Sequence, residues 1–103
     1  MLNDKKIRIG AMTYTIQEVA HPRTDDDKQR LYGDIDYCHR IIRIDKELDP
    51  ETQKATFWHE VLHGIIAHAG GKQHERVVEM IANGLYQVFL DNPWLTELIK
   101  AKE

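Results

Sequence analysis

Several features that mark secreted, membrane-spanning and nucleic-acid-binding proteins are scarce in this sequence. Its single cysteine, Cys38, cannot form an internal disulfide, which favours a reducing compartment such as the cytoplasm. The chain has no apolar run of about 18 residues, and residues 1–6 are too polar for the core of a signal peptide, so neither a membrane span nor export is expected. Lysine and arginine number 14 against 17 aspartate and glutamate residues, and the resulting net charge of −3 argues against a nucleic-acid partner.

The length and composition instead indicate one small domain. The 103 residues, of which 42% are hydrophobic, suffice for a single domain over residues 1–103 with a small core. A bound metal would help to stabilise so small a core. Histidine is the residue type that stands out, because four of the six histidines fall within one short segment: His59, His63, His68 and His74.

The first half of the chain has the alternation of β-strands. Apolar and polar residues alternate in residues 6–9 and 12–19, and residues 31–36 and 40–45 have the pattern of a hairpin. Residues 21–30 form a polar loop, whose three consecutive aspartates at 25–27 we interpret as solvated rather than as a cation site. The expected result is a small antiparallel sheet of three or four strands.

The second half changes to a helical period. Asp49, Pro50 and Glu51 are a helix start signal, and the glycines at 70 and 71 are a stop signal. A second helix is predicted over residues 73–90 and a short one over 94–100.

Apolar residues at helical spacing define the faces that these helices are expected to bury. In the first helix the apolar positions are Phe57, Val61, Leu62 and Ile65. In the second helix they are Val78, Ile81, Ala82, Leu85 and Phe89. In the third segment Trp94, Leu95, Leu98 and Ile99 are expected to cover the core rather than to form a dimer patch.

Residues 59–63 carry the strongest chemical signal, the pattern HExxH within the first helix. His59 and His63 are four residues apart and so share a helix face, from which both imidazoles can bind one ion. Glu60 is rotated away from that direction but can reach a water molecule bound to the ion. Imidazole ligands with one position left for water indicate Zn²⁺. The plainer alternative is a helix with two packed or exposed histidines.

A third ligand is expected nearby, and four residues are candidates: His68, His74, Glu75 and Glu79. On a helical wheel of the first helix, the HExxH histidines lie at one edge of the apolar stripe. Glu75 and Glu79 lie at the corresponding edge of the apolar stripe of the second helix. We therefore favour Glu75 as the ligand, with Glu79 orienting a histidine, and the reverse assignment stays open. His68 falls on the polar side of its helix and is expected in solvent. His74, at the start of the second helix, is a minor alternative ligand.

The chain resembles the short phage and prophage proteins grouped with the ImmA/IrrE-type zinc metallopeptidases in residues 57–66, 75–79 and 84–93, and also upstream in residues 31–36 and 42–45. The resemblance implies an α+β, minimal zincin-like fold in which a small antiparallel sheet is followed by the HExxH helix and a second packed helix. It also implies His59 and His63 as zinc ligands, Glu60 as the catalytic base and an acid on the next helix as third ligand. Longer members carry that acid in a Glu-Ala-Asn-x-Phe-Ala-like segment, whose nearest match here begins at Glu79.

The expected function is a zinc-dependent metallopeptidase that hydrolyses peptide bonds in a specific protein target. Glu60 would act as general base, and the substrate would lie extended along an exposed sheet edge. One alternative is a catalytically idle, zinc-stabilised binding or regulatory protein of phage origin, and another is a metal-free α+β interaction domain. Glu60 favours the enzyme, because a structural zinc site does not need a base and is usually closed by four protein ligands.

Overall fold

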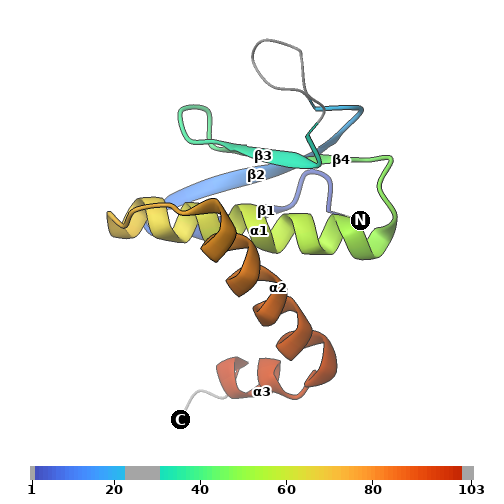
Figure 1. The fold of residues 1–103 in the computed structure, drawn as a ribbon, viewed down its shortest axis with the longest axis vertical. Helices are drawn as coiled ribbons and strands as arrows, with labels where there is room; N and C mark the ends of the chain where they lie inside the picture. Colours follow the sequence, from blue (N-terminus) through green and yellow to red (C-terminus); the bar gives the residue numbers. More distant parts are fainter. Residues whose placement is uncertain (1, 23–30, 101–103) are drawn as a thin grey trace.

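The computed structural model describes residues 2–22 and 31–100. Four strands are followed by three helices: β1 (Lys6–Ile9), β2 (Met12–Val19), β3 (Gly33–Asp36), β4 (Ile41–Asp45), α1 (Pro50–Ala69), α2 (Glu75–Asp91) and α3 (Leu95–Lys100) (Figure 1). The expected α+β class is confirmed. The acidic run at residues 25–27 lies outside the described residues, so its prediction is not tested.

The sheet is mixed rather than antiparallel, which corrects the sequence prediction. Its strand order is β1-β2-β4-β3, with antiparallel pairs at both ends and a parallel pair between β2 and β4. The most apolar arm of the β3–β4 hairpin takes the central place, since Ile42 and Ile44 are fully buried, while the polar strand β3 lies at the edge. Strand β3 runs opposite to β2, and the hairpin reverses the chain once more. Strand β4 therefore runs parallel to β2.

Helix α1 lies along one face of this sheet (Figure 1). The core between them consists of Ile9, Tyr14, Ile16, Ile42, Ile44 and Val61. Gly64 allows the close approach, because a Cβ at this position would lie 3.0 Å from Cδ1 of Ile9 and 3.2 Å from Cδ1 of Ile35. At the end of α1 the hydroxyl of Tyr14 is 2.8 Å from Nε2 of His68. His68 therefore joins the helix to β2 instead of only facing solvent.

Both predicted ends of α1 are confirmed. Asp49 is the N-cap and accepts the N–H of Thr52 at 3.1 Å, with proline at the next position. Gly70 ends the helix with a left-handed φ of 78°, a conformation that favours glycine, and its N–H bonds back to the last turn. The chain then reverses direction and enters α2.

Helix α2 packs on α1 through a second, smaller cluster. Leu62 of α1 meets Val78 and Ala82 of α2, and the rings of Trp58 and Phe89 are stacked with centroids 5.4 Å apart. The helix begins at Glu75, two residues later than predicted, because His74 is extended and occupies the N-cap. The described helices include none with the length and apolar character that a membrane span requires.

Several apolar residues that were expected in the core are exposed. Ile65 of α1 and Ile81 and Leu85 of α2 face outward, so each predicted stripe is buried only in part. The prediction that residues 94–99 cover the core is wrong for Trp94 and Leu98, which are 58% and 64% exposed, while Leu95 is half-buried and the side chain of Ile99 lies outside the described part of the structure. The physical reason is the direction of α2, which leads away from the sheet and carries α3 with it (Figure 1).

Candidate metal centre

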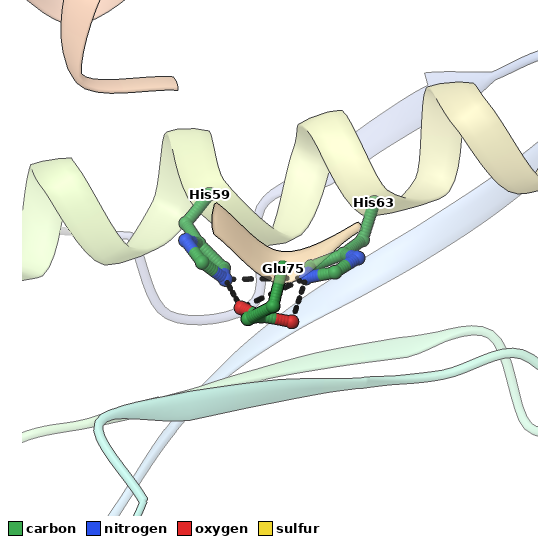
Figure 2. A group of neighbouring side chains, drawn as sticks. All are labelled: His59, His63 and Glu75. Atoms are coloured by element: carbon green, nitrogen blue, oxygen red, sulfur yellow. Dashed lines mark hydrogen bonds and ion pairs between the residues drawn. The ribbon is translucent and has the colours of Figure 1, made fainter. Parts of the chain in front are cut away.

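Three side chains from two helices converge on one point (Figure 2). His59 and His63 project from adjacent turns of α1, and their Nε2 atoms are 3.1 Å apart. Glu75, the first residue of α2, places Oε1 2.5 Å from Nε2 of His59 and Oε2 3.1 Å from Nε2 of His63. The turn at Gly70 and Gly71 makes this possible, because it brings the first turn of α2 beside the middle of α1.

The donor types, and the spacing of the two imidazole nitrogens, fit a zinc ion. One atom from each of the three residues can be chosen so that all lie within 4.8 Å of one another. Two ligands at about 2.05 Å from a tetrahedral Zn²⁺ would be about 3.3 Å apart, close to the separation of the two imidazole nitrogens. Two imidazoles and a carboxylate are also the donor types that zinc accepts in sites where a fourth position stays open.

Gln73 and Tyr37 fix the orientation of His63. The side-chain oxygen of Gln73 accepts a hydrogen bond from Nδ1 of His63, and its amide nitrogen donates to the Tyr37 hydroxyl at 3.3 Å. Tyr37 in turn donates to the backbone carbonyl of His63 at 3.4 Å. A proton on Nδ1 leaves the lone pair of a neutral imidazole on Nε2, the atom that faces His59 and Glu75.

Glu60 is the buried acid of the site. Only 7% of the residue is exposed, and it lines the same cleft as the two histidines. Burial raises its pKa from 4.5 to about 7, His63 opposes this increase, and the negative charges of Asp34 and Glu75 add to it. A carboxyl that titrates near neutral pH can both accept and release a proton, as general acid–base chemistry requires.

A cleft of about 670 Å³ opens beside these groups. The edge strand β3 and α1 line two of its sides, and Glu75, Glu79 and Asn83 of α2 line a third. In the sheet β3 pairs with β4 and has no second neighbour among the described strands, so one of its edges is free for hydrogen bonding. Asp34, within β3, is held by Arg43 through two hydrogen bonds of 2.8 and 2.7 Å.

The remaining sequence candidates lie apart from the converging atoms. Glu79 lines the cleft one turn beyond Glu75, but the partner of the Nδ1 atom of His63 is Gln73 rather than Glu79. His74 is the exposed N-cap of α2, and His68 contacts Tyr14. Gln73 was not predicted from the sequence, since a glutamine in a turn belongs to no metal-binding pattern. Its position two residues before the candidate ligand acid is the only signal that could have indicated it.

A second cluster of side chains that could bind a metal, formed by His21, Asp45 and Glu47, is explained by contacts within the protein. His21 pairs with Glu47 at 2.7 Å, and the side chain of Asp45 accepts the backbone N–H of Glu47 at 2.9 Å. Asp45 is buried at the end of β4, where it closes the turn that leads into α1. These contacts account for the cluster without a metal ion.

Comparisons of this chain with protein-family models, with curated protein sequences and with solved structures found no match. The similarity to ImmA/IrrE-type peptidases therefore stays a prediction from the sequence.

Proposed function

We propose that this protein is a zinc-dependent metallopeptidase with a specific protein or peptide as its substrate. One observation carries the proposal: two imidazole nitrogens and a carboxylate converge at a cleft that a buried glutamate also lines. Structural zinc sites are usually closed by four protein ligands, whereas three ligands beside a cleft are typical of catalytic sites. The HExxH spacing and the resemblance to ImmA/IrrE-type phage proteins support the same function.

His59, His63 and Glu75 would hold the ion. When bound, zinc would lower the pKa of a water molecule and polarise the carbonyl of the peptide bond to be cleaved. Glu60 would accept the proton of the attacking water on its carboxylate and deliver it to the departing amine. Its burial supports this role, because in the metal-free protein burial raises the pKa of Glu60 to about 7, in the range that suits a group that both accepts and releases a proton. Gln73 would keep His63 in the tautomer that leaves Nε2 available.

The free edge of β3 supports an extended peptide as the substrate. A peptide that adds to this edge would gain main-chain hydrogen bonds from Gly33–Asp36 and would pass over the converging ligands. The cleft volume is in the range of about 300–1,000 Å³ that is usual for binding sites. The side chains of Leu31, Tyr32 and Tyr37 also line the cleft and would contact the substrate.

The test compares zinc content and cleavage in matched variants. Purified protein is loaded with zinc, dialysed and incubated with a proteome-derived peptide mixture, and the products are identified by mass spectrometry. Glu60→Gln is expected to retain zinc and to lose all cleavage that the wild type shows, while His63→Ala loses both. Glu79→Gln is the control for Glu75→Gln: both remove an acid from the cleft, and only the second is expected to weaken zinc binding.

Each outcome separates the proposal from its alternatives. Identical cleavage by the wild type and by Glu60→Gln would reject the peptidase, because the activity would then come from a contaminant. A wild type that holds one zinc per chain without cleaving any peptide would favour the zinc-stabilised binding protein. A well-folded protein that binds no zinc would reject both and favour the metal-free interaction domain.

A further inference from the structure

The cleft extends beyond the candidate metal centre along both helices. On α1 its lining residues share one face that begins at Thr52, seven residues or about 10 Å before the first histidine of the HExxH pattern. On α2 they are Glu75, Glu79 and Asn83, which follow one another at intervals of four residues and so share one side of the helix. Glu79 and Asn83 therefore line a second part of the cleft, one and two turns beyond the ligand candidate.

Glu79 is the carboxylate of this second part, and it has no hydrogen-bond or ion-pair partner among the residues that the structure describes. Arg76, three residues earlier, does not line the cleft and makes no ion pair with Glu79. Glu75 is four residues earlier, and like charges at this spacing destabilise a helix. The helix dipole compensates little, because its effect falls off within the first turn. The described fold thus gives Glu79 no stabilising contact.

The groups around Glu79 suit a long side chain with a cationic end. The described lining residues include no lysine or arginine, and the two threonine hydroxyls on the α1 side already donate within the helix and to its N-cap. A carboxylate offers only acceptors, and the amide oxygen of Asn83 offers another. Leu31 and Tyr32 add apolar surface on the side of the cleft that precedes β3. Apolar surface beside a carboxylate fits the aliphatic stem and charged end of lysine or arginine.

We propose that Glu79 determines specificity in the proposed peptidase by selecting an arginine or lysine beside the peptide bond to be cleaved, an inference that rests on the proposed function. One helix turn, about 5.4 Å, separates Glu79 from Glu75, and neighbouring residues of an extended peptide are about 3.3 Å apart. A basic side chain next to the cleaved bond is long enough to bridge this distance. Its stem would pack on Leu31 and Tyr32, and its charged end would donate to Glu79 and Asn83.

Peptide binding by zinc-treated Glu60→Gln protein tests this specificity without relying on cleavage. The probe is a proteome digested by a protease that cuts after glutamate, so that internal lysine and arginine remain. Peptides retained by the immobilised protein and identified by mass spectrometry are expected to be enriched in these two residues. The most enriched peptide is then synthesised with citrulline in place of arginine, or with acetyl-lysine in place of lysine, which removes the charge and keeps the length. Fluorescence anisotropy is expected to show a dissociation constant about tenfold higher for the uncharged form.

Substitutions of Glu79, made in the Glu60→Gln protein, assign the preference to this carboxylate. Glu79→Gln is expected to bind the charged and uncharged peptides equally, and Glu79→Lys to enrich peptides with aspartate or glutamate instead. Both are expected to hold as much zinc as the parent protein. Glu97→Gln is the matched control, because it makes the same chemical change on an exposed residue of α3 that does not line the cleft. It is expected to keep the tenfold preference.

The outcomes separate this inference from the proposed function. Charge-dependent binding that disappears in Glu79→Gln, together with a wild type that cleaves no peptide, would support the basic subsite and reject the peptidase. Cleavage without arginine or lysine at a fixed position near the cleaved bond would overturn the inference and leave the peptidase in place. A preference for the charged peptide that persists in Glu79→Gln, equal binding of both peptides by the parent protein, or no retained peptide at all would also overturn the inference.

Discussion

Glutamine in place of Glu60 is expected to stabilise the metal-free protein at alkaline pH. Burial raises the pKa of this carboxyl from its ordinary value of 4.5 to about 7. Since the folded protein holds the proton more tightly than the unfolded chain, the favourable contribution of Glu60 is complete below about pH 4.5 and is lost as the pH rises through about 7. The difference between the pKa of 4.5 in the unfolded chain and about 7 in the folded protein corresponds to a total loss of about 3 kcal/mol in unfolding free energy. About 2–3 kcal/mol of this loss occurs between pH 5 and pH 8. Glutamine keeps the shape and does not ionise.

The assay is urea unfolding of chelator-treated protein, followed by circular dichroism at about pH 5 and about pH 8. The difference in unfolding free energy between Glu60→Gln and the wild type is expected to grow by about 2–3 kcal/mol toward the higher pH. Glu51→Gln makes the same chemical change on an exposed residue of the same helix and controls for the substitution itself. A difference that stays constant between the two pH values would refute the argument that burial governs the protonation of Glu60.

Three further outcomes test how the surrounding structure supports the site. Gln73→Leu is expected to weaken zinc affinity by about tenfold in a competition titration, because His63 loses the partner of Nδ1, whereas Gln87→Leu leaves the affinity unchanged. Leu62→Ala is expected to lower the unfolding free energy by about 3 kcal/mol, since it removes the centre of the contact between α1 and α2. Tyr14→Phe is expected to lower it by about 1 kcal/mol through loss of the bond to His68. Unchanged urea midpoints for these last two variants would contradict the packing described.

Local signals in the sequence predicted the elements well, and long-range packing accounts for the errors. The ends of α1 followed from Asp49, Pro50 and Gly70, because capping depends on neighbouring residues only. The parallel pairing of β2 with β4 could not be predicted from alternation, which is the same for parallel and antiparallel neighbours. The exposure of Ile81 depends on the direction in which α2 leaves α1, and no property of the α2 sequence determines that direction.

In the candidate site, too, the positions set by local sequence were predictable, and those set by long-range packing were not. The placement of His59, Glu60 and His63 depends on helical spacing alone and was predictable from five consecutive residues. The structure brings Glu75 to the two histidines, but the helical wheel could not separate it from Glu79, since both occupy the same edge of α2. Distinguishing them requires the position of the first turn of α2 relative to α1, which the turn at Gly70 and Gly71 determines.

The central claim, a zinc site made by His59, His63 and Glu75, is tested most directly by the metal content of the purified protein. The protein is loaded with zinc, dialysed against metal-free buffer and analysed by inductively coupled plasma mass spectrometry. It is expected to hold one zinc per chain. The His63→Ala variant treated in the same way is expected to hold none. A folded wild type without zinc, or a His63→Ala variant that retains the same amount as the wild type, would contradict the claim.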